Sequence, residues 1–97
     1  MSHIHLKQVA AEKPAWKSTV LANVGGANVK VMEMDGSPYP NESHDYPECL
    51  LVVNGQLNLQ FGEDLMVIRA GEMFIVPAGT PHAVAPGSSG VCLIVDQ

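Results

Sequence analysis

The feature that most constrains the fold is a succession of short apolar runs, each closed by glycine, proline or asparagine within a few residues. Cys49–Val53 is an uninterrupted apolar run, and Gln56–Phe61 alternates polar and apolar side chains. Such alternation indicates a half-buried strand, because successive side chains of a strand point to opposite faces. Asn54-Gly55 stands between the two runs. This pair predicts a β-hairpin turn, since both turn positions favour a positive φ.

The same pattern continues on both sides of this predicted hairpin. Val29 to Met34 indicates a strand that ends at Asp35-Gly36, and the proline-rich segment after it, Ser37–Asn41, is predicted to be a loop. Further strands are expected over residues 65–69, 73–76, 80–85 and 91–95, and no convincing amphipathic helix is present. Roughly seven or eight short strands with frequent turns predict an all-β sandwich or barrel. Closure into a barrel also removes exposed strand edges.

Length and charge narrow the possible partners. A chain of 97 residues supports one hydrophobic core, so we expect one domain over residues 1–97, with residues 1–15 as a tail or first edge element. The net charge of -5 argues against nucleic acid, since phosphate binding requires clustered Lys and Arg. No apolar run approaches the ~20 residues of a membrane-spanning helix. Cys49 and Cys92 are isolated in sequence, which favours reduced thiols and a cytoplasmic location.

Four residues carry side chains that bind divalent metals, namely Glu42, His44, Glu48 and His82. Glu42 and His44 are two residues apart and Glu48 has the same parity, so an extended strand would turn all three to one face. His82 follows much later and would reach the same interior if the sheet closes. Taken singly, each residue has an ordinary explanation, such as an exposed acid or a core histidine with one hydrogen bond. Together they predict a metal site.

The spacing of these residues resembles the two sequence motifs of the cupin family. The first motif, G-x5-H-x-H-x3,4-E-x6-G, is matched in spacing by Gly36, Glu42, His44, Glu48 and Gly55. The second motif, G-x5-P-x-G-x2-H-x3-N, is matched in spacing by Gly71, Pro77, Gly79, His82 and Pro86. The motif region therefore runs from residue 36 to residue 86, a little over half of the chain.

The resemblance implies a small jelly-roll barrel in which His44, Glu48 and His82 occupy the positions of the family's metal ligands. Glu42 stands where the family has a histidine, and Pro86 stands where it has an asparagine. An oxygen ligand at Glu42 would favour Mn²⁺ or Fe²⁺, with Zn²⁺ as a further candidate. If Glu42 does not coordinate, two histidines and one carboxylate remain, which are the ligand types of a facial triad.

The resemblance leaves several functions open. A metal in the barrel could polarise a carbonyl or activate water or dioxygen, so an enzyme acting on a small oxygen-rich molecule is one reading. The alternatives are a protein that binds a small ligand without catalysis and a metal-free dimeric scaffold. Because one fold hosts many reactions, the sequence assigns no catalytic residue and leaves enzyme status open. The apolar residues Cys49, Leu51 and Val53 on the opposite strand face predict a covered surface, hence a homodimer.

Overall fold

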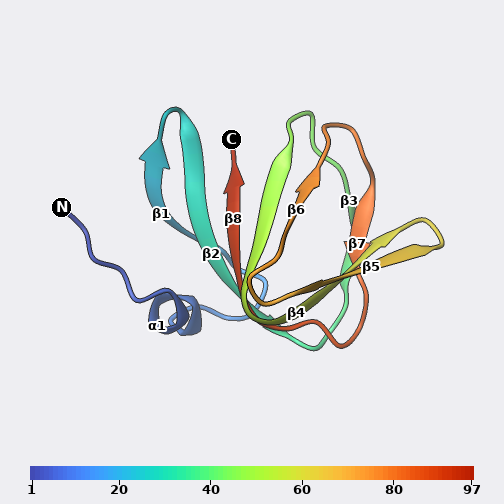
Figure 1. Cartoon of the computed structure of the whole chain (residues 1–97), viewed down its shortest axis with the longest axis horizontal. Coiled ribbons are helices and arrows are strands. Elements are labelled where there is room, and N and C mark those ends of the chain that lie inside the picture. Colours follow the sequence, from blue (N-terminus) through green and yellow to red (C-terminus); the bar gives the residue numbers. More distant parts are fainter.

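The protein, described over residues 1–97 by a computed structural model, is an antiparallel β-sheet curled into a half-barrel with one short helix (Figure 1). The elements follow in the order α1 (Leu6–Ala11), β1 (Thr19–Val24), β2 (Ala27–Asp35), β3 (Tyr39–Glu42), β4 (Glu48–Phe61), β5 (Asp64–Arg69), β6 (Met73–Val76), β7 (His82–Val84) and β8 (Ser89–Asp96). The predicted all-β jelly-roll class is confirmed. The one helix has six residues and is not long and apolar enough to cross a membrane.

Strand β4 connects the two walls of the half-barrel. The strands are hydrogen-bonded in the order β1-β2-β8-β4-β7-β3, and β5 and β6 also pair with β4. The first half of β4 pairs with β8 and β6, and its second half pairs with β5 and β7. A strand of 14 residues thus passes from one wall into the other. The curl that results encloses an interior lined by both walls.

The predicted hairpin at Asn54-Gly55 is wrong, because β4 runs through these residues without reversing. The register against β8 shifts between Val52 and Asn54, which marks a bulge. Gly55 has φ +78°, and a Cβ there would lie 1.9 Å from the carbonyl oxygen of Ser89. The glycine therefore permits a positive φ and a close approach of two backbones where β4 bends. A tight turn would have needed the same residue type.

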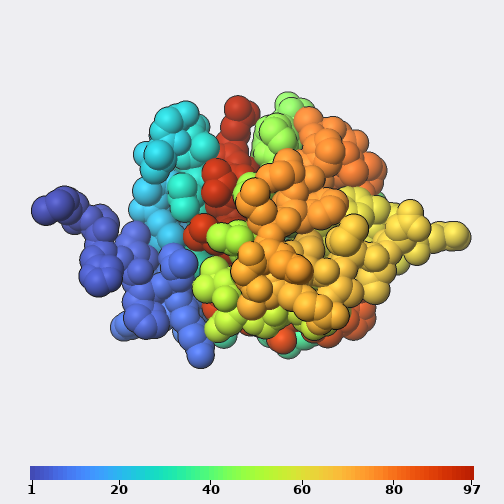
Figure 2. Space-filling model, in the orientation of Figure 1, coloured from blue at the N-terminus to red at the C-terminus, as the bar shows by residue number.

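The N-terminal residues contain a helix that the sequence did not reveal. The side chain of His5 caps α1 by accepting a hydrogen bond from the backbone N–H of Gln8. Ala10 of this helix is buried with Val31 and Val91 on the outer surface of the sheet. Figure 2 shows α1, in blue, lying against that surface at one end of the molecule. A helix of less than two turns is too short to display a clear 3.6-residue period.

The predicted loop over Ser37–Asn41 is partly wrong, because Tyr39–Glu42 forms strand β3. This strand lies at one end of the strand order and pairs only with β7. Pro40 is compatible with that place, since an edge strand does not need every backbone N–H for pairing. The predicted strands around the remaining apolar runs are confirmed, and so is the turn between β4 and β5.

The interior of the half-barrel is filled by apolar side chains from both walls. Leu57 and Leu59 are almost fully buried, as the alternation in Gln56–Phe61 predicted. The core cluster consists of Met34, Leu50, Val52, Leu57, Leu59, Ile68, Val76, Cys92 and Ile94. Five of these side chains also line the interior cavity of the half-barrel, namely Leu50, Leu57, Leu59, Cys92 and Ile94.

Candidate metal centre

The four predicted ligands come from three strands and one connection. Glu42 ends β3, His44 lies in the connection to β4, Glu48 begins β4, and His82 begins β7. Glu42 and His82 are direct partners in the β3–β7 register. His44 reaches the others through a loop contact, because its carbonyl oxygen accepts a hydrogen bond of 2.6 Å from the backbone N–H of Gly79. Strand parity, which the sequence argument used for His44, is therefore not what brings it to the cluster.

The side chains converge on one point. His82 Nε2 lies 3.7 Å from Glu42 Oε1 and 3.5 Å from Glu48 Oε1. His44 Nε2 lies 3.5 Å from Glu42 Oε1 and 4.0 Å from Glu48 Oε2. One ligand atom from each residue lies within 4.8 Å of all the others. Ligand bonds of about 2.0–2.2 Å place ligand atoms about 3–4.4 Å apart, so one ion could contact this set with small adjustments.

The orientation of His82 is the most specific feature of the cluster. Its Nδ1 lies 2.9 Å from the carbonyl oxygen of Thr80. A carbonyl only accepts, so Nδ1 donates this hydrogen bond and the other ring nitrogen, Nε2, is left for a different partner. That Nε2 is buried, has no hydrogen-bond partner, and points at the carboxylates of Glu42 and Glu48. A ring fixed through one nitrogen, with the other free towards acidic groups, is the arrangement of a metal-ligating histidine.

Glu48 is the buried carboxylate of the cluster, with 9% of its side chain exposed. Burial raises its pKa above the ordinary value, the neighbouring His44 and His82 act in the opposite direction, and Asp96 raises it further. A buried carboxylate needs a proton or a cation close by. The donor set of two imidazoles and two carboxylates thus fits a divalent ion in charge as well as in ligand type.

A cavity of about 180 Å³ adjoins the four ligands. Its polar lining outside the cluster is Ser18, Lys30, Tyr46 and Asp96. Its apolar and aromatic lining includes Trp16, Met32, Tyr39, Leu50, Leu57, Leu59, Val84, Cys92 and Ile94. The ligands therefore stand at the wall of a small, mostly apolar pocket, which is a usual setting for a small-molecule site.

Sequence reasoning missed two features of this pocket. Lys30 Nζ and Asp96 Oδ2 form an ion pair of 2.8 Å, and the Asp96 side chain is almost completely buried. The available signal was an acidic residue at the end of the apolar run that forms β8. The second feature that sequence reasoning missed is Trp16, which lines the cavity from the segment before β1. The available signal was that it is the one tryptophan of the chain.

Comparison with known proteins agrees with this geometry. Residues 27–96 match the family described as the cupin domain, and the match includes all four cluster residues. The chain belongs to the cupin family. A search of curated proteins found no match.

Three solved structures show the same cupin fold over nearly the whole chain. A cupin-2 domain containing protein from Shewanella frigidimarina is 23% identical, with a TM-score of 0.78 over 93% of this chain and 87% of that one. Protein NMB1881 from Neisseria meningitidis is 30% identical, with a TM-score of 0.75 over 98% and 96%. A Ralstonia eutropha protein provisionally named a mannose-6-phosphate isomerase is 24% identical, with a TM-score of 0.79 over 99% and 97%.

The two departures from the cupin motifs have distinct structural settings. Glu42, at the position of the first motif histidine, directs Oε1 to both histidines of the cluster. Pro86, at the position of the last motif residue, lies away from the cluster, and its carbonyl oxygen accepts a hydrogen bond of 3.0 Å from Asn58 Nδ2. The first departure changes the chemistry of the site, and the second changes a backbone contact outside it.

Proposed function

We propose that this cupin holds one divalent transition-metal ion through Glu42, His44, Glu48 and His82, and uses it to bind and act on a small oxygen-rich molecule. The observation that carries the proposal is the buried, unpartnered Nε2 of His82, which faces two carboxylates. The second carboxylate in place of a histidine favours Mn²⁺ or Fe²⁺, with Zn²⁺ as the further candidate.

The chain's own residues define what such a site would do. When bound, a divalent ion supplies a Lewis acid that can polarise a carbonyl or lower the pKa of a coordinated water. Glu42 and Glu48 would balance its charge, and the Thr80 carbonyl would hold the ring of His82 in place. Tyr46, whose pKa burial raises, keeps its hydroxyl proton at neutral pH and can donate it in a hydrogen bond.

A second candidate function is ligand binding without turnover. The pocket contains one thiol, that of Cys92, and burial raises its pKa to about 12. This group stays protonated, so it supplies neither a nucleophile nor a metal ligand. Outside the metal cluster the lining is mainly apolar, which suits binding better than covalent chemistry. Product formation from carbonyl substrates by the metal-loaded protein would separate the two functions.

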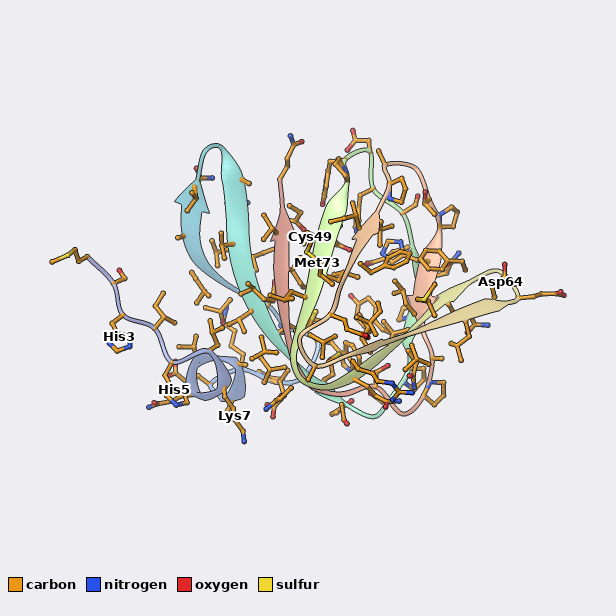
Figure 3. The ribbon with its side chains drawn as sticks, viewed as in Figure 1. His3, His5, Lys7, Cys49, Asp64 and Met73 are labelled. Carbon is orange, nitrogen blue, oxygen red and sulfur yellow. The ribbon has the colours of Figure 1, made fainter.

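The test of the metal proposal is elemental analysis of the untagged protein after incubation with Mn²⁺, Fe²⁺ or Zn²⁺ and removal of free ions. The wild type should retain about one ion per chain. His82→Ala should lose it, because it removes a buried nitrogen ligand. His3→Ala is the matched control, since His3 lies on the N-terminal segment away from the cluster (Figure 3), and it should retain the ion. A wild type that stays free of all three metals would contradict the proposal.

We also propose that two copies associate through the outer surface of the sheet. The residues that share this surface are Cys49, Leu51, Val53, Met73, Ile75, Leu93 and Val95. Met73 and Ile75 are 62% and 49% exposed. Figure 3 shows Cys49 and Met73 beside each other on it, with 3.8 Å between their sulfur atoms. A continuous set of partly exposed apolar side chains favours burial against a second copy.

Both cysteines are free, which suits a protein in a reducing cytoplasm.

A further inference from the structure

Trp16 stands in a costly backbone conformation at the edge of the pocket. It is the one residue other than glycine with a positive φ, at 70°. Its backbone N–H donates to the carbonyl oxygen of Glu33 at 2.9 Å. Its indole Nε1 donates to Asp35 Oδ1 at 2.9 Å and to Ser37 Oγ at 3.0 Å. A left-handed conformation is unfavourable for a residue with a bulky side chain, and three hydrogen bonds hold Trp16 in it.

These contacts hold the indole against Tyr39. The two ring centroids are 5.6 Å apart and the planes are inclined by 38°. Trp16 is hydrogen-bonded to β2, whereas Tyr39 belongs to β3, and these strands stand near opposite ends of the strand order. Both side chains line the cavity. This pair of rings, called the aromatic wall from here on, therefore spans the gap between β2 and β3 at the edge of the cavity.

The aromatic wall comes partly from outside the family domain. The cupin match covers residues 27–96, so Tyr39 lies within it and Trp16 precedes it. Trp16 packs against the edge of the core and stays only partly buried, so part of its side chain is left to line the cavity. An aromatic face left towards a cavity is a surface on which a flat ligand group can stack.

The charges of the pocket select against an anionic ligand. Glu42 and Glu48 would neutralise a bound dication, and Lys30 already neutralises Asp96 at 2.8 Å. A ligand carboxylate that captured Lys30 would leave Asp96, whose side chain is 1% exposed, without its cation. Burying an unpaired charge is expensive. The remaining N–H groups of Lys30 can still donate to a neutral oxygen.

We propose that the aromatic wall of Trp16 and Tyr39 is a ligand-binding surface, and that the pocket takes a small uncharged molecule with two distinct ends. One end carries the oxygen atoms for the metal, a part that rests on the proposed metal function, and the other presents a flat aromatic or unsaturated face. The cavity of about 180 Å³ is small, and its lining combines apolar and polar side chains, which suits a small molecule of this kind.

The test compares two probes that differ mainly in charge, 2-hydroxyacetophenone and mandelate, on zinc-loaded protein labelled with ¹⁵N. The single tryptophan gives one indole N–H signal, which reports on the wall directly. The neutral probe should shift this signal and bind at least about tenfold more tightly than mandelate, a difference of about 1.4 kcal/mol. Equal affinity for the two probes, or an indole signal that does not move, would overturn the proposal.

Substitutions in the aromatic wall distinguish its contribution to probe binding from the contribution of the metal. Trp16→Leu should weaken binding of 2-hydroxyacetophenone by about three- to tenfold, while zinc affinity changes by less than about twofold. Leu65→Ala is the control, because Leu65 is 57% exposed on β5 and does not line the cavity. If Trp16→Leu does not fold, Tyr39→Leu carries the same expectation. Unchanged probe affinity in a folded wall variant would contradict the inference.

Failure of the proposed metal function can be distinguished from failure of the aromatic wall as a binding surface. If the wild type binds none of Mn²⁺, Fe²⁺ and Zn²⁺, the proposed function fails, and the aromatic wall is tested with acetophenone on the metal-free protein. The phenyl ring should still shift the indole signal at probe concentrations of about 10 mM. No shift under those conditions would overturn the aromatic wall as a binding surface.

Discussion

At the residue scale, His82 and Glu48 are two buried groups that face each other, with 3.5 Å between His82 Nε2 and Glu48 Oε1. The Thr80 carbonyl fixes His82 with its Nε2 towards the carboxylates, and that nitrogen has no other partner. Burial raises the pKa of Glu48 and so disfavours its charge. Each group costs stability in the metal-free protein, and a divalent ion would offset both costs.

This cost predicts that Glu48→Gln stabilises the metal-free protein at neutral pH. A raised folded pKa means that the Glu48 contribution to stability is present below the unfolded pKa of about 4.3 and is lost as pH rises through the folded pKa. At pH 7.5 in chelator, the variant should gain about 1 kcal/mol, or about 4–8 °C in Tm.

Circular dichroism melts between pH 4 and pH 8 measure this difference. The advantage of the variant should shrink towards pH 4, where the wild-type carboxyl is protonated. A variant less stable than the wild type at pH 7.5 in chelator would contradict the assigned role of Glu48.

The sequence predicted the members of the site better than their geometry. All four predicted ligands meet, because Glu42, Glu48 and His82 lie at strand ends that the fold brings together and His44 lies in the connection between two of these strands. Strand parity did not account for His44, which a hydrogen bond from Gly79 positions. Lys30 and Asp96 were not predicted, since their contact depends on the register between β2 and β8. Periodicity within one strand carries no information about register between strands.

At the element scale, the bend of β4 makes the pocket. One strand serves both walls only because Gly55 lets the backbone of β4 approach that of β8, where it pairs with Gly90. The Asn-Gly pair was interpreted as a turn because turns and bulges require the same positive φ. Helix α1 and strand β3 were also missed. One is too short for a period, and the other contains Pro40 at an edge where proline is tolerated.

Gly55→Ala should therefore be much more destabilising than alanine at an ordinary turn glycine. Its Cβ would meet the Ser89 carbonyl oxygen at 1.9 Å, in addition to the left-handed strain at φ +78°. Gly62→Ala is the matched control, because Gly62 has φ +58° and nothing within 4 Å of an added Cβ.

In urea unfolding, the free energy of unfolding should fall by about 1 kcal/mol for the Gly62 variant and by more than about 2 kcal/mol for the Gly55 variant. Equal losses in the two variants would show that the close approach at Gly55 contributes nothing beyond its backbone angle.

At the scale of the whole molecule, the two surfaces of the sheet have different uses. The inner surface carries the cluster of two glutamates and two histidines and the pocket, and α1 covers part of the outer surface around Val31 and Val91. The part of the outer surface around Met73 and Ile75 stays exposed, at 62% and 49% for these two residues. A second copy would cover it without obstructing the pocket, because the two surfaces lie on opposite sides of one sheet.

The homodimer predicts a specific effect of charge on the outer surface. The wild type should sediment as a dimer at micromolar concentration, and Met73→Asp should sediment as a monomer because an unpaired carboxylate would be buried at the interface. Leu65→Asp adds the same charge on β5, outside the proposed interface, and should remain dimeric. A monomeric wild type would contradict the association.

The most direct test of the central claim is the position of a bound metal in crystals of the protein loaded with Mn²⁺. Anomalous diffraction should show one strong peak per chain among Glu42, His44, Glu48 and His82, with bonds of about 2.2 Å. Bonds to all four residues would establish that Glu42 replaces the family's histidine as a ligand. A peak found only beside the N-terminal His3 or His5, or the absence of any peak in crystals soaked with excess Mn²⁺, would contradict the account.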